Sequence, residues 1–206
     1  MATRPDGKPL IGRLVRLDQA SIDDLPDLFE ALDHPEVYAS GYADGARPGT
    51  WQEMASRLPG PEESRVCYVV RLARDCDFGA AGTVIGTTSV GDIDISRQRC
   101  QVGWTGYRPD VWGTAINPDC KMVLLRHIFD DCGFERVQLQ TDSINTRSQA
   151  AISKLGATRE GVLRRHQPRA DGTWRDTVVF SILRDEWPTV SSWLERRVAE
   201  ADPNQR

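Results

Sequence analysis

The feature that most constrains this fold is a change of hydrophobic period in the middle of the chain. The stretch CQVGWTGY (Cys100–Tyr107) has the composition of a strand, whereas from Asn117 the apolar residues recur at helical spacing until Gly133. The next stretch, RVQLQT (Arg136–Thr141), again has the pattern of a strand. A strand–helix–strand unit of this kind makes its two strands parallel and its crossover right-handed. The pattern therefore predicts a sheet with helices packed against it.

The rest of the chain supplies the other elements. Segments rich in β-branched residues or with alternating polarity predict strands, and segments with an apolar stripe predict helices. Ser21 and Asn145 are the predicted N-caps of two of these helices. In chain order we predict a strand at 11–17, helices at 21–34 and 50–58 (stopped at Pro59-Gly60), strands at 66–73, 83–94 and 100–107, a helix at 117–132, a strand at 136–141, a helix at 145–156, strands at 160–167 and 173–183, and a helix at 185–200.

This order predicts an α+β protein with three layers, α/β/α, around a mixed sheet. A chain of 206 residues is expected to form one domain or a slightly elaborated one. We expect residues 1–9 to be a loose N-terminal arm, residues 10–200 to be a single domain, and residues 201–206 to be a frayed tail.

Composition excludes several classes of protein. The chain is 39% hydrophobic and 27% charged, with a net charge of −4, so bulk electrostatics argue against a nucleic-acid binder. No segment approaches the ~20 apolar residues of a membrane span. The five cysteines form no CxxC pair, so we expect no metal site and reduced thiols. We therefore predict a cytoplasmic protein with no nucleic-acid or membrane partner.

The junction YRPDVWGTAINPDCK (Tyr107–Lys121) is the candidate ligand site. A helix start leaves N–H groups without partners and carries about half a positive charge. Gly113, Thr114 and Ala115 give a ligand access to the main chain, and Asn117-Pro118 is the predicted N-cap and first helical residue. This arrangement suits phosphate or pyrophosphate, although a tight turn that binds nothing is the alternative. GxxxxGK[ST] and GxGxxG motifs are both absent from the sequence.

The strand before the junction adds a second indication. Gly103 and Gly106 lie inside it, and glycine in a strand often marks a bulge or the close approach of another backbone. A ligand with amide groups can pair with a strand edge of this kind. A peptide-like arm together with a pyrophosphate describes coenzyme A.

At these positions the sequence resembles the GNAT N-acetyltransferase superfamily and, within it, the RimJ/RimL-type branch. DVWGTA (Asp110–Ala115) is similar to the family's Q/R-x-x-G-x-G/A loop, with Asp110 where Gln or Arg is usual. The Trp112-Gly113 pair matches the branch pattern YWGKGYA. Asn145 and Ser148 match the later N-x-x-S/A motif. The resemblance covers about residues 10–190, and the two motifs in order are more specific than either alone.

The resemblance implies a GNAT fold, with a sheet of about seven strands splayed at a cofactor cleft, acetyl-CoA as donor, an amine as acceptor and no metal. It also implies three groups of cofactor-binding residues. Main-chain N–H groups would hold the pyrophosphate, a strand would pair with the pantetheine arm, and the N-x-x-S motif would approach from the other side. In that order the groups are Trp112, Gly113, Thr114, Ala115, Ile116 and Asn117; Gln101, Val102, Gly103 and Trp104; and Asn145 with Ser148.

Three lysine and arginine residues on the predicted helices are further candidates. Lys121, Arg126 and Lys154 would either meet the adenosine phosphates or form a solvated helix face. The sequence leaves both alternatives open.

Acyl transfer to an amine needs a neutral nitrogen, donors for the oxyanion and a proton for the leaving thiolate. Asp92 and Asp94 alternate along one strand, so they are candidate bases, with Glu160 and His166 as alternatives. Ser148 is the candidate acid. Some relatives have a Tyr acid seven residues after the motif's Asn, where this chain has Ile152. Tyr107 is a further hydroxyl. The aromatic candidates for an acceptor pocket are Tyr42, Trp51, Phe78 and Trp174.

The sequence thus predicts an acetyl-CoA-dependent N-acetyltransferase that acts on a small amine, an antibiotic or a protein N-terminus by direct attack in a ternary complex. The alternative is a CoA-binding protein of the same shape without transferase activity. The acceptor is not readable from the sequence, and a homodimer is one of the open oligomeric states.

Overall fold

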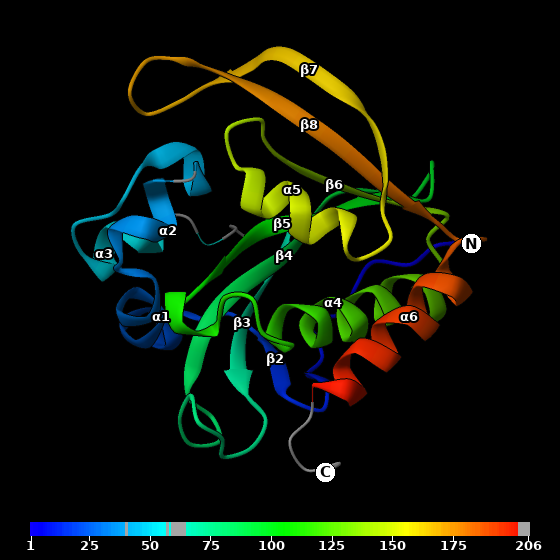
Figure 1. Ribbon diagram of the computed structural model, residues 1–206, viewed down its shortest axis with the longest axis horizontal. Coiled ribbons are helices and arrows are strands. Elements are labelled where there is room, and N and C mark those ends of the chain that lie inside the picture. Colours follow the sequence, from blue (N-terminus) through cyan, green and yellow to red (C-terminus); the bar gives the residue numbers. More distant parts are fainter. Residues whose placement is uncertain (40, 57, 59–64, 202–206) are drawn as a thin grey trace.

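Figure 1 shows the computed structural model, which describes residues 1–39, 41–56, 58 and 65–201. Two sets of elements build it. The strands are β1 Leu10–Ile11, β2 Val15–Gln19, β3 Val66–Leu72, β4 Val84–Asp94, β5 Arg99–Tyr107, β6 Arg136–Asp142, β7 Thr158–Pro168 and β8 Trp174–Leu183. The α-helices are α1 Leu25–Leu32, α2 Pro35–Ala39, α3 Trp51–Ala55, α4 Ile116–Arg126, α5 Thr146–Ser153 and α6 Trp187–Glu200, with short helical turns η1 Ile22–Asp24, η2 Tyr42–Gly45, η3 Pro109–Val111 and η4 His127–Asp131.

The strands form one mixed sheet in the order β1-β2-β3-β4-β5-β6-β8-β7. Among the described strands only the β5–β6 pair is parallel, and α4 connects the two strands, as the change of period predicts. The described residues contain eight strands rather than about seven. The extra strand arises because the predicted strand 11–17 turns back on itself, with Gly12 N donating to Val15 O at 2.8 Å.

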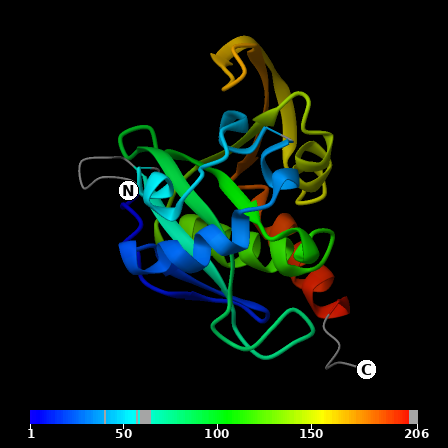
Figure 2. The same cartoon turned by 90° about the vertical axis from the view of Figure 1, so that its left-hand side faces the viewer.

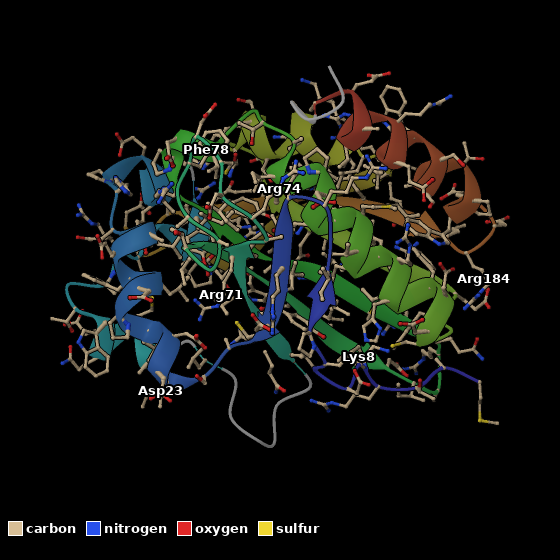
Figure 3. All side chains as sticks on the ribbon, turned by 90° about the horizontal axis from the view of Figure 1, so that it is seen from below. Lys8, Asp23, Arg71, Arg74, Phe78 and Arg184 are labelled. Atoms are coloured by element: carbon tan, nitrogen blue, oxygen red, sulfur yellow. The ribbon has the colours of Figure 1, made fainter. Side chains whose placement is uncertain are left out.

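Helices cover both faces of the sheet, which confirms the three-layer α/β/α fold (Figures 1 and 2). Alternate residues of β3 enter opposite cores. Tyr68 and Val70 pack on the side of α4 and α6, whereas Val69 packs on the side of α1. Figure 3 shows α4 and α6 side by side on their face of the sheet. Because α6 and the sheet enclose α4, nearly every side chain of α4 is buried.

The N-terminal segment is packed rather than loose. Ala2 is buried in the main core, and Thr3 N donates to Cys132 O at 2.8 Å. Lys8 and Asp131 form an ion pair at 3.3 Å. The prediction of a loose arm is therefore wrong. The first residues are held against residues 131 and 132, which follow α4.

Helix boundaries follow local signals with a few shifts. Asn145 caps α5 by accepting from Ser148 N at 2.9 Å, as predicted. Ser21 and Asp24 form the reciprocal capping pair at η1, immediately before α1. The predicted start of α4 is wrong: Ala115 is its N-cap, so Asn117 is already inside the first turn. The expected stop at Pro59-Gly60 and most of the predicted frayed tail lie outside the described residues.

The sheet opens between β5 and β6. These strands pair only from Arg99 to Val102 on β5 and from Arg136 to Leu139 on β6. Beyond this point β6 remains paired with β8 and β5 with β4, but not with each other. The edge of β5 from Gly103 onward therefore faces the opening with its main-chain groups free of a β6 partner.

Candidate active site

A cavity of about 770 Å³ occupies this opening. Its walls come from β5 and β6, from the start of α4, from α5, and from α1 and η2 on the opposite face of the sheet. The separation of β5 and β6 beside the start of α4 therefore creates one space. Around it lie the main-chain edge of β5, the N–H groups at the start of α4 and the side chains of the pocket.

The first wall is the free edge of β5. The β4–β5 register shifts between Thr87 and Ser89, and Trp104 has a positive φ of 50° at this bulge. Gly106 has no room for a side chain, because a Cβ there would lie 2.9 Å from the ring of Tyr42. The predicted bulge is thus confirmed, whereas the close neighbour at Gly106 is a side chain rather than another backbone.

The free edge of β5 begins two residues later than the predicted pairing stretch, Gln101 to Trp104. All four residues line the cavity, but Gln101 and Val102 are already paired with β6. The Gln101 side chain is buried and its Oε1 accepts from Gln138 Nε2 at 3.4 Å. The edge that a ligand arm can use begins at Gly103 and continues toward Tyr107.

The second wall is the loop before α4. Gly113 has φ = 77°, a conformation that favours glycine, and the position of its missing Cβ is open. The N–H groups of Gly113, Thr114 and Ala115 donate to no acceptor in the part of the chain that the structure describes. Since these groups precede a helix N-terminus, they form a site suited to an anion.

The remaining predicted loop residues divide between the cavity and the core. Trp112, Gly113, Thr114 and Asn117 line the cavity. Ala115 lines a smaller hollow beside it, and Ile116 is buried. The loop is internally braced, because the Trp112 indole donates to Tyr107 O at 2.9 Å and Thr114 Oγ1 donates to Val111 O at 2.7 Å.

Asp110, the departure from the family pattern, has a local explanation. Arg108 donates to its carboxylate through Nε at 2.7 Å and through Nη2 at 2.8 Å. The same guanidinium donates to Phe78 O at 2.6 Å. The acidic residue therefore holds an arginine that fixes the loop to the β3–β4 connection, and it does not face the cavity with a free charge.

The third wall is α5. Asn145 and Ser148 both line the cavity, but the Asn145 Oδ1 is used for the helix cap. The Ser148 side chain is half-buried, and its hydroxyl makes no hydrogen bond with the described residues. Arg147 stacks on Trp112, with its guanidinium carbon 3.4 Å from the ring centroid, and thus connects this wall to the loop across the cavity.

Lys121 has a setting that the sequence does not reveal. It is 5% exposed and lines the cavity floor, so the alternative of a solvated helix face is wrong. Its Nζ donates to Thr88 Oγ1 at 2.8 Å and to Thr105 Oγ1 at 2.7 Å. Burial lowers the pKa of this lysine, since the surroundings disfavour the charged form. Arg126, by contrast, points outward and pairs with Glu195 at 2.9 Å.

The cavity is strongly basic in an acidic protein. Among the residues that the structure describes, six lysine and arginine side chains line it against two aspartates, whereas the whole chain has a net charge of −4. The basic residues are Arg65, Lys121, Arg147, Lys154, Arg175 and Arg197, and the acidic ones are Asp44 and Asp142. The sequence cannot reveal this patch because its basic members come from five separate segments, with Arg147 and Lys154 both on the α5 segment.

Asp92 and Asp94 lie away from this cavity. Neither lines it, because both are at the turn between β4 and β5, at the opposite end of β5 from residues 112–115, the anion loop. Asp94 accepts from Ser96 Oγ at 2.7 Å and from Arg97 N at 3.0 Å, and these bonds hold its pKa well below its usual value. The predicted shared face fails because the register shifts after Gly91 and Asp92 has φ = 49°.

The other predicted base and acceptor residues also fall largely outside the cavity. Glu160 pairs with Arg136 at 2.6 Å, and His166 lies beside Thr177 at 3.0 Å. Of the four predicted aromatic residues only Tyr42 lines the cavity; Trp51, Phe78 and Trp174 do not.

Sequence reasoning missed two acidic residues in the walls. Asp142, at the end of β6, binds Arg169, and Asp44 in η2 binds Arg175 at 3.0 Å. Burial would raise the pKa of Asp142, but the bonds from Arg169 outweigh it and lower the pKa. Both carboxylates are therefore ion-paired, and they attach the β7–β8 hairpin to the rim of the cavity.

The described residues contain no group of three or more His, Cys, Asp or Glu side chains placed to hold a metal ion. They also contain no helix that is long and apolar enough to cross a membrane.

Comparisons with known proteins identify the family. The model of the acetyltransferase (GNAT) domain matches residues 14–158. A provisionally named acetyltransferase from T. thermophilus is 32% identical, with a TM-score of 0.79 over 96% of this chain and 100% of that chain. An uncharacterized N-acetyltransferase, p20, from Bacillus licheniformis is 28% identical over 104 residues. That match spans 50% of this chain and 57% of the relative's length.

Two more distant structures share the fold. A GCN5-related N-acetyltransferase from Brucella melitensis is 22% identical, with a TM-score of 0.84 over 98% of this chain and 89% of that chain. RimJ from Mycobacterium smegmatis, solved in complex with CoA-disulfide, is 19% identical, with a TM-score of 0.72 over 94% of each chain. The fold and the family match together define an acetyltransferase. The chain belongs to the GNAT acetyltransferase family, as its motifs predict.

Proposed function

We propose that this protein transfers the acetyl group of acetyl-CoA to a primary amine by direct attack in a ternary complex, as an N-acetyltransferase of the RimJ/RimL type. One observation carries the proposal: the free edge of β5 from Gly103 leads directly to the unpartnered N–H groups of Gly113, Thr114 and Ala115. A ligand with an amide arm and a diphosphate matches both features in order.

Different parts of the chain would hold the pantetheine arm and the diphosphate of this ligand. The main chain of residues 103–107 would pair with the amides of the pantetheine arm, as a strand pairs with its neighbour. The loop N–H groups and the positive end of α4 would hold the diphosphate. The basic residues of the cavity would add long-range attraction for a polyanionic ligand, because opposite charges in a cleft raise the local ligand concentration.

One structural relative supports both the RimJ/RimL type and the binding of CoA. RimJ from Mycobacterium smegmatis, in complex with CoA-disulfide, has the same fold at 19% identity. In this chain the Trp112-Gly113 pair and the Asn145 cap occupy two walls of one cavity, as the branch motifs would require.

The chemistry needs alignment and charge stabilisation rather than a covalent intermediate. Main-chain N–H groups at the β5 bulge are candidate donors to the oxyanion, worth about 3 kcal/mol each in comparable sites. Ser148 remains a candidate proton donor, since its hydroxyl makes no hydrogen bond with the described residues.

On the acceptor side, Ser89 Oγ is a feature that the sequence does not predict. It is buried in the cavity wall without a hydrogen-bond partner among the described residues. An amine or a water molecule would satisfy this hydroxyl. The acceptor would enter between α1, η2 and the β7–β8 hairpin, which line this side of the cavity.

The test is incubation of the purified protein with acetyl-CoA and a panel of small amines, aminoglycosides and peptides with free N-termini, with release of free thiol monitored. Acceptor-dependent thiol release supports the proposal. Saturable CoA binding without thiol release for any acceptor would instead support a non-catalytic CoA-binding protein, an outcome to which Ile152 in place of a tyrosine lends weight. A homodimer and a cytoplasmic location stay predictions.

A further inference from the structure

We propose that Lys121 is a catalytic residue that stabilises and protonates the leaving thiolate during acyl transfer. The inference rests on the proposed function and assigns a role to a group that no motif in the sequence indicates. It is drawn from the place of Lys121 in the cavity floor and from the side chains that hold it there.

The ammonium group is held at the point where the sheet opens. Thr88 on β4 and Thr105 on β5 both accept from Nζ, at 2.8 and 2.7 Å. Thr105 is the third residue beyond Val102, the last β5 residue paired with β6. Lys121 therefore lies beneath the inner end of the free edge, whereas the anion loop lies at the outer end.

The hydrogen bonds leave the lysine a proton to give. The two threonine hydroxyls are 2.8 Å apart, and Thr105 Oγ1 donates to Gly103 O at 3.3 Å. These hydroxyls can thus accept two of the three ammonium protons while satisfying their own hydrogens within the chain. One N–H remains for a group inside the cavity.

The charge of Lys121 is not neutralised by the protein. It forms no ion pair with any described residue. On its own helix, the Asp119 carboxylate is occupied by Leu14 N and Val15 N at 2.7 and 3.0 Å. Cys120 precedes Lys121 on α4 and interacts with Tyr107 on β5; burial raises the pKa of both groups, which keeps them neutral.

More distant charged groups also line this cavity. Asp142 and Asp44 are each paired with an arginine. The basic groups besides Lys121 are Arg65, Arg147, Lys154, Arg175 and Arg197. Burial disfavours the charge of the Lys121 ammonium, whose partners are neutral hydroxyls. A thiolate that forms beside it would therefore stabilise the charged lysine.

Atoms and protons balance in this step. As the acceptor nitrogen bonds to the thioester carbon and the C–S bond breaks, the electron pair of that bond stays on sulfur. Lys121 gives one proton to the sulfur and becomes a neutral amine. The acetylated nitrogen releases one proton to solvent, and Lys121 regains one from solvent. A lysine whose pKa is lowered toward that of a thiol is suited to this exchange.

The experiment measures the thiol pKa of bound CoA from the ultraviolet absorbance of its thiolate, with desulfo-CoA on the same protein as the blank. In the wild-type protein we expect a pKa below that of free CoA. In Lys121→Met we expect it to rise by about 1 to 3 pH units, the effect of removing a nearby opposite charge. Lys154→Met removes a positive charge from another part of the same cavity and is expected to leave the thiol pKa at the wild-type value.

Each outcome decides between the two proposals. Absence of CoA binding to the wild-type protein, measured by calorimetry, would overturn the proposed function and this inference together. CoA binding with the same thiol pKa in wild type and Lys121→Met would overturn only the role of Lys121. If Lys121→Met does not fold, Thr88→Val, which removes one anchor of the ammonium, must raise the thiol pKa in the same direction, and an unchanged value would again overturn the role.

Discussion

Asp142 and Arg169 form a two-point ion pair at the rim of the cavity, with Nε 2.6 Å from Oδ2 and Nη2 2.8 Å from Oδ1. The Asp142 side chain is 1% exposed and that of Arg169 is 14% exposed. Arg169 also donates to Trp174 O at 2.8 Å, so the pair joins the end of β6 to the β7–β8 hairpin. This enclosed salt bridge, together with the Asp44–Arg175 pair, therefore helps to fix the acceptor side of the cavity.

Asp142→Asn is expected to destabilise the protein by about 3 kcal/mol, because it leaves the guanidinium of Arg169 without its buried counter-charge. Urea unfolding measures the change. Glu195→Gln is the matched control, since it breaks the exposed pair with Arg126 and should cost less than about 1 kcal/mol. Equal effects from the two variants would show that the Asp142–Arg169 pair does not hold the hairpin.

The same ion pair predicts an acid limit to stability. The pKa of Asp142 is lowered in the folded protein, so its contribution to stability is fully present above the unfolded value of about 3.9. That contribution is lost as the pH falls below about 3.9 toward the folded pKa, because the unfolded state then binds the proton more strongly. Unfolding midpoints across this pH range should therefore converge for wild type and Asp142→Asn. Curves that remain parallel down to low pH would contradict the assignment.

Gly113→Glu is expected to weaken CoA binding at least about 100-fold, because it places a carboxylate beside the unpartnered N–H groups where an anion would bind. Gly82→Glu is a close match, since Gly82 also has a positive φ, 87°, and an open Cβ position, but it does not line the cavity. Both variants share the backbone strain. Calorimetric titration with CoA should therefore separate them, and similar losses in both would argue against the loop as the anion site.

The local parts of this site could be predicted from the sequence. The elements of the strand–helix–strand unit, the Asn145 cap and the Gly113 turn each depend on a pattern within one short stretch of sequence, and the structure has all three. The Asp92 and Asp94 prediction failed because it assumed a regular two-residue alternation, whereas the bulge after Gly91 breaks it.

The parts that needed the structure depend on long-range packing. A lysine in a helix is usually exposed, and nothing local to Lys121 shows that β4 and β5 supply its two threonine partners. The Asp142–Arg169 pair joins residues 27 positions apart, and the charge pattern alone does not select it from other pairings. In the same way, the burial of Ala2 depends on the distant residue Cys132, whose carbonyl oxygen accepts a hydrogen bond from Thr3 N.

The basic cavity predicts that CoA affinity depends on salt. Six basic side chains against two paired aspartates should attract the phosphates of CoA, and added salt screens such attraction. We expect the dissociation constant of CoA to rise about tenfold between low salt and ~0.5 M NaCl. Pantetheine, which has the arm but no phosphates, is the control ligand, and its weaker binding should change little. Equal salt dependence of the two ligands would contradict an electrostatic role for the cavity.

The contact between Arg147 and Trp112 predicts a graded series of variants. The guanidinium lies 3.4 Å from the ring centroid and connects α5 to the anion loop. Arg147→Lys keeps a charge but loses the planar stack, whereas Arg147→Ala loses both. We therefore expect CoA affinity to fall about fivefold in Arg147→Lys and further in Arg147→Ala, since a cation over an indole contributes about 1 kcal/mol. Arg126→Ala removes a charge from the outward face of α4 and should leave the affinity unchanged. If Arg147→Ala binds CoA as tightly as the wild type, the stack only joins the two walls and takes no part in holding the ligand.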